Sequence, residues 1–191
     1  SLRCIPNTVI AAPKDETELK RLLNTGLGIK DGPLVIRYPR GIGEGTDWRN
    51  AESTPLPIGK GERLADGEDV AVLALGPVAN RALEAAERLR KETGKSPAVF
   101  NVRFLKPFDQ EILKESAGYR CILTLEDGAI KGGLFSEVSE YVASTGARIP
   151  VIGVGIPDRF ITQAPVGRQR EQCGLTTEII YSKIVSLIKN N

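Results

Sequence analysis

Short apolar runs alternate with helix-like segments along almost all of the 191 residues, and this alternation constrains the fold more than any other feature. The clearest run is Val70–Leu75, which Gly76 and Pro77 separate from a stretch with alanine and leucine at helical spacing. Strands that alternate with helices predict a largely parallel sheet, because each helix crosses back between two parallel strands. We therefore expect an α/β sandwich.

Residues 1–40 contain one strand–helix–strand unit. The apolar runs at 8–12 and 34–38 predict two buried, parallel strands. Between them Asp15 is placed as an N-cap, and Glu18 follows three positions later as in a capping box. Because one such unit cannot cover both faces of its own sheet, we expect residues 1–40 to end a larger α/β domain.

A second, complete domain is expected at residues 56–191, after a glycine-rich polar linker at 41–55 that is long enough to form a strap between domains. The strands expected in it are residues 58–63, 70–75, 98–102, 121–125 and 150–154. Four helices are expected in it. One begins at Pro77, and the others cover residues 109–117, 134–144 and 176–188.

Composition excludes several kinds of chemistry. The chain has no His, which excludes a Ser-His-Asp triad, a His proton shuttle and a His-ligated metal. Its 26 basic and 24 acidic residues leave a net charge of +2, which gives no reason to expect nucleic acid or a membrane as partner. Three dispersed cysteines, no spanning segment and no signal peptide predict a cytoplasmic protein with reduced thiols. The lack of Met predicts a processed chain or a fragment.

The sharpest candidate site is the turn Arg37–Gly41, at the carboxyl end of the second expected strand. The turn carries the guanidinium groups of Arg37 and Arg40 and the phenol of Tyr38. Arginine side chains bind phosphate or carboxylate through two parallel hydrogen bonds. An interdomain salt bridge, with Tyr38 in the core, is an equally good interpretation. A second glycine-rich turn, Gly128–Gly133, follows the carboxylates Glu126 and Asp127. It can hold an anion, but we interpret the glycines as close packing and the carboxylates as a strand end or helix cap.

Six stretches resemble, in the right order, motifs of the 1-deoxy-D-xylulose 5-phosphate synthase family. They are Leu2–Pro6 (LRCIP), Ala12–Glu16 (APKDE), Ile36–Gly41 (around RYPRG), Leu56–Glu62 (LPIGKGE), Asn101–Asp109 (near RFVKPLD) and Gly155–Phe160 (GIPDRF). Transketolase and the 2-oxoacid dehydrogenase β subunits share some of the other patterns. The combination of RYPRG and GIPDRF indicates the synthase.

The resemblance implies a homodimeric transferase that uses thiamine diphosphate and Mg²⁺. Such an enzyme decarboxylates pyruvate and joins the two-carbon unit to glyceraldehyde 3-phosphate, a step toward isoprenoids, thiamine and pyridoxal. The chain would be its C-terminal fragment, inactive alone: the tail of the pyrimidine-binding domain (1–40) and the transketolase C-terminal-like domain (56–191). The resemblance assigns the substrate phosphate to Arg40, the second arginine of RYPRG, and we expect Arg37 to form a structural ion pair.

No stretch matches the family's cofactor, metal or catalytic motifs, so we expect no catalytic, cofactor-binding or metal-binding residue in this chain. Departures from the family pattern lie in the transketolase C-terminal-like domain expected at 56–191. Glu126–Gly128 stands in place of EEN, Gly133–Ser136 in place of a GGFGS-like turn, and Gln163 in place of a common His. The alternatives are a fragment of another thiamine diphosphate enzyme or a non-catalytic interaction module.

Overall fold

The larger part of the molecule is a five-stranded sheet between two layers of helices. A computed structural model describes residues 2–189, and its large sheet has the order β3-β5-β4-β7-β8. These strands are β3 (Glu62–Ala65), β4 (Val70–Leu75), β5 (Ala98–Asn101), β7 (Cys121–Ala129) and β8 (Val151–Ile156). All neighbours are parallel except the edge strand β3, so the expected mostly parallel α/β sandwich is confirmed.

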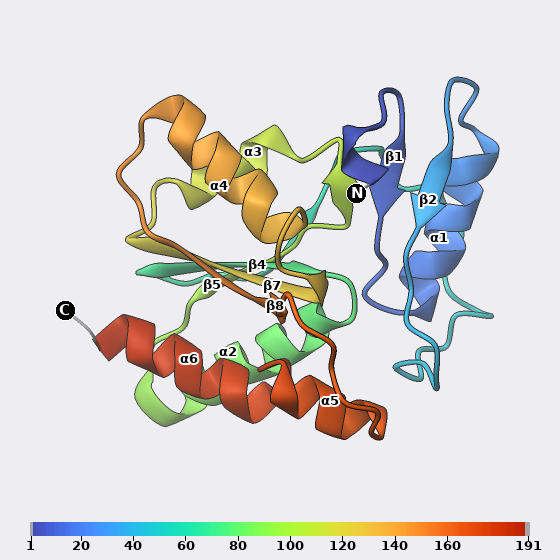
Figure 1. Cartoon of the computed structure of the whole chain (residues 1–191). Coiled ribbons are helices and arrows are strands. Elements are labelled where there is room, and N and C mark those ends of the chain that lie inside the picture. The colour runs from blue at the N-terminus through green and yellow to red at the C-terminus, as the bar shows by residue number, and fades with distance from the viewer. Residues whose placement is uncertain (1, 190–191) are drawn as a thin grey trace.

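Helices cover both faces of this sheet (Figure 1). One face carries α2 (Val78–Thr93) and α6 (Thr177–Lys189), and the other carries α3 (Gln110–Ser116) and α4 (Leu134–Thr145). Every side chain of β4 is buried, because alternate residues point into the two apolar cores. Val72 packs in the core toward α2 and α6, whereas Leu73 packs in the core toward α3 and α4.

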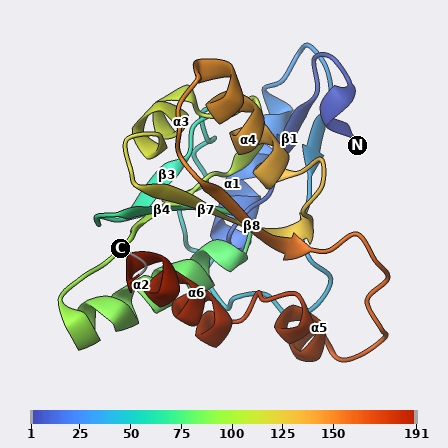
Figure 2. The same cartoon turned by 60° about the vertical axis from the view of Figure 1, so that its left-hand side comes forward.

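The predicted strand–helix–strand unit is present beside the large sheet (Figures 1 and 2). It consists of β1 (Val9–Ala11), α1 (Glu16–Leu27) and β2 (Leu34–Ile36), and the two strands are parallel as expected. Asp15 caps α1 by accepting a hydrogen bond from the Glu18 N–H at 2.8 Å. The Glu18 carboxylate accepts a hydrogen bond from the Lys14 N–H and not from the Asp15 N–H. The prediction of a full capping box is therefore wrong.

An unpredicted strand, β6 (Phe104–Lys106), pairs antiparallel with β1 and completes a small sheet of order β2-β1-β6. Just before it Arg103 adopts a positive φ of 59°, which turns the chain away from β5. Phe104 is fully buried and packs with Ala11 and Leu22. The two regions are therefore joined by a shared sheet and a shared apolar cluster, although the division into residues 1–40, 41–55 and 56–191 stays a prediction.

Residues 41–55, all of which the structure describes, form no helix or strand. The segment lies along α1, because Lys20, Arg21 and Asn24 of that helix donate side-chain hydrogen bonds to its carbonyl groups. Two other expectations need correction. The edge strand expected at 58–63 is found at 62–65, and α5 (Val166–Gln172) was not expected. No helix within residues 2–189 is long and apolar enough to cross a membrane.

Candidate functional site

A cavity of about 500 Å³ opens beside the turn that carries the two arginines. Its walls are the turn and following residues 38–44, the residues 13–16 that enter α1, and Pro77, Val166 and Arg170 from the later part of the chain. Arg40 lies on its rim, is exposed, and has no hydrogen-bond or ion-pair partner among the described residues. The predicted site residue is therefore free to bind an anion.

Arg37 has a different environment from Arg40. Its Nη1 donates to the Glu126 Oε1 at 2.7 Å, which confirms the expected structural ion pair. The other carboxylate oxygen of Glu126 accepts the Leu134 N–H at 2.7 Å, at the start of α4. A carboxylate at a helix N-terminus is favourable, and here it is only 4% exposed. Glu126 thus anchors the turn to the second region and fills the place that an anion would take at α4.

The glycines of the expected turn make room for this ion pair, although β7 continues to Ala129, so that Gly128 lies in the strand and not in a turn. A Cβ on Gly128 would overlap the Arg37 guanidinium, and a Cβ on Gly133 would overlap the Glu126 carboxylate. The structure thus supports the interpretation of these glycines as close packing, and of Glu126 as a helix cap.

Most charged groups around the cavity are already paired. Lys14 donates to Asp15 at 2.7 Å; burial lowers the pKa of Lys14, but Asp15 and Glu18 outweigh it and raise the pKa overall. The Glu16 carboxylate accepts from the Gly45 N–H at 2.9 Å and from Thr46, and the bond from Gly45 is the main cause that lowers the pKa of Glu16.

Arg170 of α5 is a cavity residue that the sequence did not single out. Its Nε is buried without a hydrogen-bond partner, and its ion pair with Asp127 is long, at 3.9 Å. The segment before α5 contains Pro157 and Pro165 and lacks helical periodicity, so the sequence does not point to a helix at this position.

A buried polar network holds the cavity wall from behind. Glu18 accepts from the Arg103 Nε at 2.5 Å and from the Asn101 Nδ2 at 2.9 Å, and it also accepts the Lys14 N–H. Arg103 donates in addition to Glu62 at 2.6 Å. The segment at Lys14 is therefore tied to β5 and to the turn before β6.

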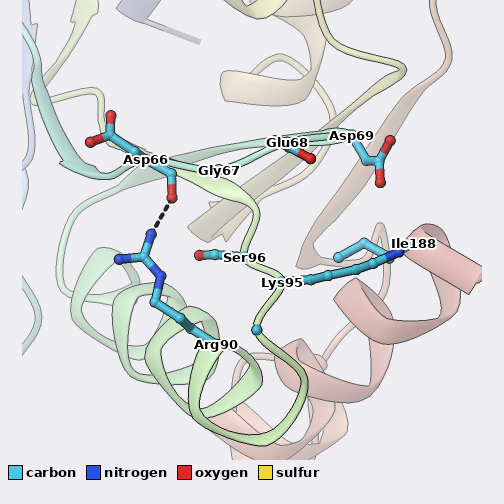
Figure 3. A pocket seen from close by; sticks show the side chains of 9 residues that line it. Asp66, Gly67, Glu68, Asp69, Arg90, Lys95, Ser96 and Ile188 are labelled. Carbon is cyan, nitrogen blue, oxygen red and sulfur yellow. Dashed lines mark hydrogen bonds between the residues drawn. The ribbon is translucent and has the colours of Figure 1, made fainter.

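A second cavity, of about 350 Å³, lies at the amino end of β4 (Figure 3). Asp66, Glu68, Arg90 and Lys95 line it, and the Arg90 Nη2 donates to the Asp66 carbonyl at 2.6 Å. Ligands of open parallel sheets bind at the carboxyl ends of the strands, so we assign no site to this cavity.

Three comparisons place the chain among known proteins. The family model "Transketolase, C-terminal domain" matches residues 59–180. Proteins named 1-deoxy-D-xylulose-5-phosphate synthase from Parabacteroides distasonis and Rippkaea orientalis are 45% and 42% identical over 96% and 100% of the chain. The chain spans 29% and 30% of their lengths.

A solved structure titled "Split gene transketolase, inactive beta4 tetramer" matches with a TM-score of 0.83 at 29% identity. The match covers 98% of this chain and 60% of that one. Together with the named relatives, it confirms the resemblance that the motifs indicated.

Proposed function

Because the chain belongs to the transketolase C-terminal domain family, we propose that it forms part of a 1-deoxy-D-xylulose 5-phosphate synthase, in which it binds a substrate phosphate. The whole protein would join a two-carbon unit from pyruvate, with loss of CO₂, to glyceraldehyde 3-phosphate. The observation that carries the proposal is that the two arginines of the RYPRG turn have different environments. Arg37 is held by Glu126, while Arg40 stays unpaired beside a cavity.

Arg40 is well placed for this role. Pro39 fixes the backbone before it, and Gly41, at a φ of 144°, permits the sharp turn after it. The ion pair of Arg37 holds the same turn against the large sheet. Arg40 therefore loses less freedom when it binds a phosphate than an arginine on a mobile loop would.

The cofactors belong, in this proposal, to other parts of the whole protein. Thiamine diphosphate supplies the carbanion chemistry when bound, and Mg²⁺ accompanies its diphosphate. Among residues 2–189, no three His, Cys, Asp or Glu side chains gather into a possible metal site. We therefore assign these residues no catalytic step.

We also propose that the whole protein is a homodimer in the cytoplasm. Ile42 and Phe160 are apolar and fully exposed in the described structure, and an assembly would cover such side chains. The three cysteines all lie in the described part and form no disulfide there, in agreement with a reducing compartment.

The test is a product assay on the purified whole protein with pyruvate and glyceraldehyde 3-phosphate. We expect CO₂ release and a five-carbon deoxyketose phosphate. Transfer from a ketose phosphate without CO₂ release would instead support a transketolase. No transfer with either donor would favour a non-catalytic interaction module.

A further inference from the structure

The packing around α5 fixes where Arg170 lies. The Arg170 carbonyl accepts the N–H of Leu175 at 2.8 Å, and Leu175 is buried in the core under α2 and α6. The backbone at Arg170 is thus held by the large domain core, although α5 itself has only seven residues. From there the side chain reaches the same cavity that Arg40 lines from the other region.

The Arg170 guanidinium lacks adequate partners within the described structure. Its side chain is only 24% exposed, its Nε makes no hydrogen bond, and Asp127 is too far for one. Unpaired buried donors are costly and therefore rare, and this one belongs to a side chain that lines the cavity, where a bound anion would offset the cost.

Arg81 of α2 is a second cation close enough to Arg170 to interact with it. Its closest carboxylate is Glu44, at 3.6 Å. Burial and then the nearby charge of Arg170 lower the pKa of Arg81. The carboxylates of Glu44, Asp127 and Glu84 raise the pKa of Arg81 and offset part of this effect, and an anion bound beside Arg170 would offset more of it.

The carboxylates at the cavity cannot supply that anion. Asp15 caps α1 and pairs with Lys14, Glu16 is bound by Gly45 and Thr46, and Glu44 lies against Arg81. Arg40 and Arg170 are thus the cations that line the cavity and have weak partners or none among residues 2–189.

We propose that Arg170 is a second phosphate-binding residue, and that it closes an arginine clamp with Arg40 on the phosphate of the aldehyde substrate. A phosphate dianion offers three terminal oxygens to two guanidinium forks, whereas the single charge of a carboxylate needs only one. The identity of the ligand rests on the proposed function, but the anion site rests on Arg170 itself.

The experiment uses the whole protein and compares Arg170→Ala and Arg170→Lys with Arg168→Ala. Arg168 is a matched control, because it lies on the same helix, is exposed, and does not line the cavity. Two measurements are made: binding of inorganic phosphate by calorimetry, and steady-state kinetics with glyceraldehyde 3-phosphate, unphosphorylated glyceraldehyde and pyruvate. Circular dichroism and the Tm verify that each variant is folded.

We expect Arg170→Ala to weaken phosphate binding, and to lower kcat/KM for the phosphorylated aldehyde, by about tenfold or more. Arg170→Lys should recover part of the loss, and Arg168→Ala, the KM for pyruvate and the rate with unphosphorylated glyceraldehyde should stay unchanged. Phosphate binding in a folded Arg170→Ala protein equal to that of wild type would overturn the clamp. If wild type makes no product but Arg170→Ala still loses phosphate binding, the proposed function fails and the anion site stands.

Discussion

The substitution Glu18→Ala removes the centre of the polar network that joins α1 to the large domain. Glu18 is 3% exposed and accepts hydrogen bonds from Arg103, Asn101 and the Lys14 N–H. The substitution leaves Arg103, which is 12% exposed, with Glu62 as its carboxylate partner, and it removes the best acceptor of the Asn101 amide. Breaking one partner out of a buried ion pair costs about 3–5 kcal/mol.

That loss is large against a total stability of about 5–15 kcal/mol. For a chain of this length it corresponds to a fall in Tm of roughly 6–20 °C. Glu18→Gln keeps the shape and one acceptor but not the charge, so it should lose less. Glu87→Ala is the matched control, since Glu87 is an exposed helical glutamate, and it should stay within about 0.5 kcal/mol of wild type.

The assay is urea unfolding of the 191-residue chain, with hydrogen exchange to locate the effect. We expect amides of Val9–Ala11 to lose protection while those of Val70–Leu75 keep it, because the complete domain expected at residues 56–191 should fold as a unit of its own. A loss for Glu18→Ala that matches the loss for Glu87→Ala would refute the reasoning about the network. Equal loss of protection in both strands would refute the independence of the two regions.

Three further outcomes are expected. In the whole protein, Arg40→Ala should lower kcat/KM for glyceraldehyde 3-phosphate by at least about tenfold and leave the KM for pyruvate unchanged, as steady-state kinetics would reveal; equal damage to both would mean that Arg40 supports the fold. Glu126→Ala should lower the free energy of unfolding by about 2–3 kcal/mol in urea titrations, because the buried Leu134 N–H loses its acceptor and Arg37 its partner; a loss below that of the Glu87→Ala control would contradict this. Calorimetric titration of the 191-residue chain with thiamine diphosphate and Mg²⁺ should give no binding, and micromolar affinity would move the cofactor site into this chain.

The sequence predicted the strands and helices whose apolar patterns are local, and it missed those that depend on distant partners. Val70–Leu75 is apolar throughout, and its strand was placed at the correct residues. β6 has only three residues, and it exists because β1, nearly a hundred positions earlier, offers a free edge. α5 has no buried face that a periodic pattern could reveal. The expectations for Arg37 and Arg40 rested on a sequence motif, whereas Arg170 was identified only from its contacts in the structure.

The arrangement of the two sheets explains why the cavity lies between the regions. β1 ends at Ala11 and is followed by Ala12 and Pro13, and β4 ends at Leu75 and is followed by Gly76 and Pro77. A Cβ on Gly76 would lie in contact with Ala12, and the Asn80 Nδ2 donates to the Lys14 carbonyl at 2.9 Å, so the two carboxyl ends abut. Ligands bind at such ends, and here the ends of both sheets face one cavity.

Neither region forms that cavity alone. The first supplies Arg40, the second supplies Arg170, and the Glu18 network holds the two walls together. A change at Glu18 should therefore weaken phosphate binding in the whole protein even though its carboxylate does not line the cavity. Stability of the interface and affinity for the phosphate are thus expected to fall together in Glu18→Ala, whereas Arg170→Ala should lower the affinity alone.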